Sequence, residues 1–139
     1  MRQYQEQIYI PCRGRGMYEI TLQVRQSLET TPLQCGMLTL FLGHTSCSLM
    51  LHENNDMRAR HDLENFLSQL VPDGKQSYAH SDEGPDDMPS HIRATLTNTS
   101  INIPIRDGKM VLGSWQGIFL YEHRILQQRR RITLHLMGE

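Results

Sequence analysis

The chain has 139 residues, of which 38% are hydrophobic, and this length suits one domain with its own core. Its formal net charge of -1 gives no general attraction to nucleic acid or to anionic lipid, so neither is an expected partner. No apolar run approaches the roughly 18 residues that span a membrane, and no signal peptide is visible, so we expect a cytoplasmic protein without a membrane partner.

The first half of the chain predicts two strands and two helices. Residues 3–11 alternate polar and apolar side chains, which is typical of a strand. Residues 19–30 have apolar side chains four positions apart, which indicates a helix, and the almost wholly apolar run 35–42 suits a buried central strand. Residues 56–70 form the clearest helix, whose apolar face comprises Leu63, Phe66, Leu67 and Leu70.

The second half adds a short helix and several strands. We expect a helix at 88–97, a hairpin turn at Asp107-Gly108, and strands at 101–105, 110–112, 118–122 and 132–136. Strands outnumber helices, and several are joined by hairpins. The sequence therefore predicts a single compact α+β domain over residues 1–139, with a mixed or antiparallel sheet and two to three short helices.

Residues 78–93 form a polar stretch that carries two histidines, His80 and His91. Four carboxylates in the same stretch, Asp82, Glu83, Asp86 and Asp87, predict an exposed or cleft-lining loop. Asp87 occupies the position of a helix N-cap, and Pro89 suits the first helical turn. The segment could thus deliver two imidazoles to one site, or it could be a solvated acidic loop in which the histidines only bind Glu83 and Asp87.

Two further polar segments attract notice. His44 follows the apolar run 35–42, and the hydroxyls of Thr45, Ser46 and Ser48 suit either anionic oxygens or ordinary strand edges and turns. Trp115 and Gln116 lie between two glycines, which forfeit packing and let other groups approach. Dinucleotide-binding, P-loop and zincin motifs are missing, and the three widely spaced cysteines indicate neither a disulfide framework nor a thiolate zinc site.

Five motifs, taken in order, resemble those of the YjbQ family of secondary thiamine-phosphate synthases. They are Gly-His-Thr-Ser-x-Ser-Leu at 43–49, Glu-Asn-x-Asp at 53–56, Tyr-x-His at 78–80, Glu-Gly-x-Asp-Asp-Met-Pro-Ser-His at 83–91 and Gly-Ser-Trp-Gln-Gly at 113–117. The resemblance implies a compact α+β domain that forms a homotrimer and has weak thiamine-phosphate synthase activity. Cys47, Ser114 and His123 depart from the family pattern.

The resemblance also implies a site. His44, His80 and His91 match family motifs, and three neutral imidazoles with an open position suit a catalytic divalent ion, here zinc, magnesium or manganese. Near them we expect Thr45 and Ser46 to contact a diphosphate, Trp115 and Gln116 to hold a flat ring, and Glu83, Asp87 and Glu122 to orient the imidazoles. The remaining histidines His52, His61 and His135 are expected to be structural or solvated.

The implied reaction joins an aminopyrimidine diphosphate to a thiazole phosphate and releases pyrophosphate. Two alternatives stay open. The same site could hydrolyse a phosphorylated metabolite, in which case phosphate would appear without a second substrate. The protein could also be a non-catalytic metabolite binder.

Overall fold

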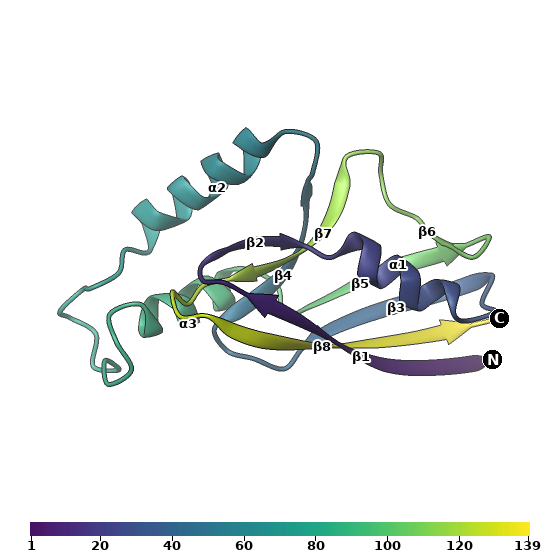
Figure 1. Ribbon diagram of the computed structural model, residues 1–139, viewed down its shortest axis with the longest axis horizontal. Coiled ribbons are helices and arrows are strands. Elements are labelled where there is room, and N and C mark those ends of the chain that lie inside the picture. Colours follow the sequence, from purple (N-terminus) through teal and green to yellow (C-terminus); the bar gives the residue numbers. More distant parts are fainter.

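The computed structural model describes all 139 residues and contains two antiparallel sheets and three helices (Figure 1). The larger sheet has the strand order β1 (Arg2–Cys12), β8 (Gln128–Gly138), β3 (Cys35–Leu42), β5 (Ser100–Arg106) and β6 (Lys109–Met110). The smaller sheet has the order β2 (Gly16–Glu19), β7 (Gln116–Glu122) and β4 (Cys47–Glu53). This architecture confirms the predicted α+β class, and every strand pairing is antiparallel.

The main core lies between the two sheets and is completed by α1 (Thr21–Glu29), which contributes Val24 and Leu28. The predicted strand 35–42 is β3, and it is central in the larger sheet. It is less buried than its apolar sequence predicts, because Leu38 and Leu40 face the core while Phe41 is 52% exposed on the other face. An antiparallel sheet covered on one side only explains this alternation.

The second helix, α2 (Met57–Leu70), lies at the periphery of the molecule (Figure 1). Its position agrees with the sequence, but most of the apolar face that the sequence indicates is not buried. Only Leu67 is buried, whereas Phe66 is 61% and Leu70 57% exposed. Leu67 packs in a small second core with Met50, Phe119 and Tyr121. None of the helices is both long and apolar enough to cross a membrane.

The third helix, α3 (Asp87–Leu96), is linked to α2 by an ion pair. Arg93 of α3 is buried, and its guanidinium donates two hydrogen bonds of 3.1 Å to the carboxylate of Glu64 on α2. Tyr121 of β7 also donates its hydroxyl hydrogen to Glu64. The two helices are therefore held beside the end of the smaller sheet by polar contacts as well as by apolar packing.

The hairpin turn predicted at Asp107-Gly108 is confirmed. Both residues have positive φ angles, 54° and 71°, as a two-residue hairpin of this kind requires. The strand after the turn, β6, has only two residues, so the prediction of a strand at 110–112 was too long.

Candidate metal centre

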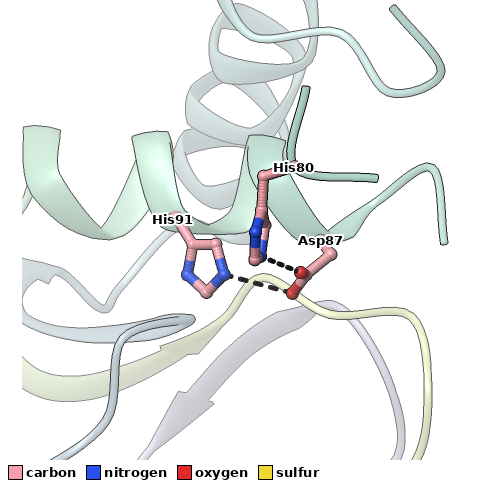
Figure 2. A group of neighbouring side chains, drawn as sticks. All are labelled: His80, Asp87 and His91. Atoms are coloured by element: carbon pink, nitrogen blue, oxygen red, sulfur yellow. Dashed lines mark ion pairs between the residues drawn. The ribbon is translucent and has the colours of Figure 1, made fainter. Parts of the chain in front are cut away.

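Two histidines and one aspartate converge where α3 begins (Figure 2). Asp87 is the first residue of α3, His91 lies one turn later on the same face, and His80 comes from the preceding loop. The Nε2 atom of His80 lies 2.8 Å from Asp87 Oδ2, and the Nε2 atom of His91 lies 3.2 Å from Asp87 Oδ1. One potential ligand atom from each residue lies within 4.8 Å of the others, which is close enough for a shared cation.

The sequence predicted an exposed or cleft-lining loop, and two of its four carboxylates are instead buried. Asp82 and Glu83 are exposed, but Asp86 and Asp87 are buried. Arg124 accounts for the difference, because its guanidinium donates to Asp86 Oδ2 at 3.0 Å and to Asp87 Oδ1 at 2.7 Å. Burial alone would raise the pKa of Asp86, but hydrogen bonds from the Ile125 amide and from Arg124 hold it below its usual value.

Asp87 also differs from its predicted role as a helix N-cap. The capping position belongs to Asp86, whose side chain makes no capping hydrogen bond, and Asp87 is already helical. The Asp87 carboxylate is thereby directed at the two imidazoles rather than at the backbone of its own helix (Figure 2).

The tautomer of His91 follows from its hydrogen bond. Its Nδ1 atom lies 2.8 Å from the carbonyl oxygen of Thr45, which only accepts hydrogen bonds, so Nδ1 is the donor. In a neutral ring Nε2 then carries a lone pair, and this lone pair lies beside Asp87 Oδ1. Two acceptors at 3.2 Å repel each other unless a proton or a metal cation lies between them.

The other carboxylate oxygen of Asp87 lacks a hydrogen-bond donor. Asp87 Oδ2 is buried and makes no hydrogen bond, although His80 Nε2 is only 2.8 Å away. The distance suits a hydrogen bond, but the imidazole is not oriented to donate along it. A buried, unpartnered carboxylate oxygen is costly, and a cation is the partner that its charge favours.

His44 lines the same cavity as His80 and His91, which has a volume of about 630 Å³. Its Nε2 atom, however, accepts a hydrogen bond of 3.1 Å from the backbone amide of Arg131. Burial and the charges of Arg130 and Arg131 lower the pKa of His44, so the ring is neutral at pH 7 and its hydrogen is on Nδ1. The structure thus places Asp87, rather than His44, with His80 and His91 as the third potential ligand.

Most of the other residues predicted near the histidines contact arginines rather than imidazoles. The Ser46 hydroxyl accepts a hydrogen bond of 2.8 Å from Arg130, whose Nε donates to Glu122 at 2.8 Å. Glu83 contacts Arg124, and Thr45 lines the cavity. Neither Glu83 nor Glu122 has an ion pair or side-chain hydrogen bond with an imidazole.

Trp115 and Gln116 lie away from the histidines within one chain. Gln116 begins β7 and lines a separate groove of about 910 Å³, and its side-chain oxygen accepts a hydrogen bond from the Gly113 amide. Trp115 is 60% exposed. The opposite end of β7 adjoins the metal-centre candidate, so the seven residues of the strand, about 20 Å long, separate the two places.

Sequence reasoning gave no site role to two residues that follow β7. His123 is fully buried, and burial, followed by the charges of Arg93, Arg15 and Arg130, lowers its pKa to about 3. Arg124, as shown above, holds Asp86 and Asp87. In the sequence Arg124 stands near a basic cluster typical of a charged strand flank, and only its position in space distinguishes it.

Together, the fold and the cluster define a small α+β protein with two antiparallel sheets and a His-Asp-His group at the start of a helix. The chain belongs to the YjbQ family: residues 6–139 match the family model described as "UPF0047 protein YjbQ-like". The resemblance found in the sequence is thereby confirmed.

Curated relatives match over nearly their whole length. The chain is 43% identical over 137 residues to UPF0047 protein YjbQ of Escherichia coli O157:H7, covering 98% of this chain and 99% of the relative. It is 42% identical over 138 residues to a UPF0047 protein of Synechocystis, covering 99% and 94%. These descriptions give the family and state no activity.

Solved structures share the fold. A YbjQ-like protein of unknown function from Sulfolobus solfataricus has a TM-score of 0.89 and 27% identity, covering 99% of both chains. A conserved hypothetical protein from Thermus thermophilus has a TM-score of 0.85 and 27% identity, covering 95% of this chain and 99% of that one.

Proposed function

We propose that the protein is a metal-dependent enzyme for a phosphorylated small molecule, and that His80, Asp87 and His91 hold one divalent ion. The orientation of His91 is the main support for this proposal. Its Nε2 lone pair lies beside the carboxylate of Asp87, whose Oδ2 atom makes no hydrogen bond. Metal-binding histidines in proteins commonly donate their second ring N–H to a backbone carbonyl, as His91 does to Thr45.

The donor set fits a transition metal. Two imidazoles and one carboxylate favour zinc over magnesium, while manganese is also compatible with a carboxylate ligand. A bound divalent ion supplies a Lewis acid that neutralises negative charge on phosphate oxygens. His44 lines the cavity with its hydrogen on Nδ1, and it is a candidate donor to the same oxygens, together with the hydroxyl of Thr99.

The family resemblance suggests synthesis of thiamine phosphate as the reaction. In that reaction the cavity would bind the departing diphosphate. The divalent ion and the surrounding hydrogen-bond donors would stabilise the negative charge that develops on it. Hydrolysis of a phosphorylated metabolite is the second candidate. One observation favours it: within one chain, the cavity that holds the histidines has no aromatic platform, because Trp115 lies beyond the far end of β7.

A single assay separates these reactions. Zinc-loaded protein is incubated with the pyrimidine diphosphate, with and without the thiazole phosphate, and thiamine phosphate, pyrophosphate and free phosphate are quantified. Synthase activity requires both substrates, whereas a hydrolase releases phosphate from one. The control variants are Asp87→Asn, which should be inactive, and His61→Ala on the exposed face of α2, which should be fully active. If no product forms above the Asp87→Asn background, both reactions are refuted for these substrates.

The proposed assembly is a homotrimer, as the resemblance implies. Large apolar side chains on the surface of the single chain support burial against other copies, namely Phe41, Phe66, Leu70, Trp115 and Leu126. Light scattering at micromolar concentrations should return three times the chain mass. A monomer mass across that range would refute the assembly without bearing on the metal site.

A further inference from the structure

We infer that Arg124 is a positioning residue that selects Asp87, among the four carboxylates of residues 82–87, as the metal ligand and fixes which of its oxygens is free. The inference rests on the metal centre proposed above. Arg124 itself touches neither histidine and is not a ligand.

Every nitrogen of the Arg124 guanidinium contacts the segment that carries these carboxylates. Nε donates to Asp86 Oδ2 at 3.0 Å, one terminal nitrogen donates to Asp87 Oδ1 at 2.7 Å, and the other donates to the carbonyl oxygen of Glu83 at 2.8 Å. The side chain is only 11% exposed, so water competes little for these bonds. Such a planar fork holds several acceptors in one arrangement, which a lysine cannot do.

These bonds leave one oxygen for a cation. Asp86 Oδ2 is already shared between Arg124 and the amide of Ile125, at 3.0 and 2.9 Å. Asp87 Oδ1 accepts from Arg124, whereas Asp87 Oδ2 has no hydrogen bond and faces His80. Asp82 and Glu83 extend into solvent. Asp87 Oδ2 is therefore the one side-chain oxygen of this group that is buried and accepts no hydrogen bond.

The charge of Arg124 opposes a cation, so its orienting effect must outweigh its repulsion. The Arg124 guanidinium pairs with the two buried carboxylates, Asp86 and Asp87, and with the exposed carboxylate of Glu83 at 3.6 Å, so the group keeps a net charge of -2. The site therefore still attracts a cation. Without Arg124, two buried carboxylates would repel each other, and Asp87 could rotate away from the imidazoles.

Arg15 offers a matched control. It is also an arginine of low exposure, 16%, and it also ties the loop before α3 to the segment after β7. Its Nε donates to the carbonyl oxygen of His123 at 2.8 Å, and its terminal nitrogens donate to Asp73 at 2.8 and 3.0 Å. Arg15 makes no contact with Asp87. If Arg124 acted only by docking the loop, both arginines would affect metal binding equally.

The test measures zinc affinity by competition with a chromophoric chelator, and thermal unfolding of the metal-free proteins. We expect Arg124→Ala to weaken zinc binding about 10- to 100-fold, the usual effect of losing a group that orients a ligand. Arg124→Lys keeps the charge but loses the fork, and it should weaken binding about tenfold or more. The zinc affinity of Arg15→Ala should stay within about threefold of the wild-type value. This should hold even if Arg15→Ala lowers the unfolding temperature as much as Arg124→Ala does. Added methylguanidinium should restore part of the affinity of Arg124→Ala.

These measurements test the role of Arg124 separately from the existence of the metal centre. A wild type that binds no zinc overturns both. A wild type that binds zinc, with Arg124→Ala and Arg124→Lys binding it as tightly or more tightly, overturns the role of Arg124 and leaves the metal centre standing. Equal losses in Arg124→Ala and Arg15→Ala also overturn it. If Arg124→Ala does not fold, Arg124→Lys decides.

Discussion

His123 makes the stability of the fold depend on pH. The ring is fully buried, its Nε2 lies 2.8 Å from the Ser48 hydroxyl, and its Nδ1 has no partner. Burial, with the charges of Arg93, Arg15 and Arg130, lowers the pKa of His123 to about 3. An unfolded chain binds the proton near the usual histidine value of about 6.5, so His123 contributes stability above that pH and the contribution is lost as pH falls.

The size of the effect follows from the two pKa values. A folded pKa of about 3 lies about 3.5 units below the unfolded one, which sets an upper limit of about 5 kcal/mol. At about pH 4.5 only part of the limit is reached, and linkage gives a loss of about 2–3 kcal/mol relative to about pH 7. Below the folded pKa both states bind the proton, and no further loss occurs.

The assay is urea unfolding with a chelator present, at about pH 7 and about pH 4.5, for the wild type and His123→Phe. Phenylalanine cannot be protonated, and the hydrogen bond to Ser48 is lost at both pH values, so its cost cancels in the comparison. The free energy of unfolding of the wild type should fall by about 2–3 kcal/mol more than that of His123→Phe. His61→Gln, a change on the exposed side of α2, should behave as the wild type. Parallel losses in wild type and His123→Phe would refute the reasoning.

Two further substitutions test the packing and the separation of the two ends of β7. Arg93→Ala removes the buried partner of Glu64 and should lower the free energy of unfolding by about 3–5 kcal/mol, measured in urea; a change below about 1 kcal/mol would show that α2 docks without this ion pair. Trp115→Ala should leave the free energy of zinc binding unchanged within about 0.5 kcal/mol, because Trp115 is 60% exposed in the single chain and distant from His80 and His91; a tenfold loss of zinc affinity would contradict this placement.

The local features of the fold were predictable because neighbouring residues determine them. Asp107-Gly108 supplies the positive φ angles of the hairpin, and the alternation of Ile103 and Ile105 marks the buried face of β5. Pro89 marks the first turn of α3. The exposure of Phe66 was not predictable, because a helical pattern shows which face is apolar and not what covers it.

The site was only half predictable for a similar reason. His80, Asp87 and His91 lie in one motif, and the i, i+4 spacing of the last two puts them on one helix face. What distinguishes Asp87 from the other carboxylates is Arg124, 37 positions away. His44 matches a family motif, but its lone pair is taken by the Arg131 amide, 87 positions away. Such long-range contacts leave no periodic signal in the sequence.

The metal content of protein purified without an affinity tag tests the central claim most directly. After zinc soaking and removal of excess metal, elemental analysis should find about one ion per chain in the wild type. His80→Ala, Asp87→Ala and His91→Ala should each lose it, while His61→Ala and, more tellingly, His44→Ala should retain it. A wild type without metal, or full metal content in the first three variants, would contradict the account.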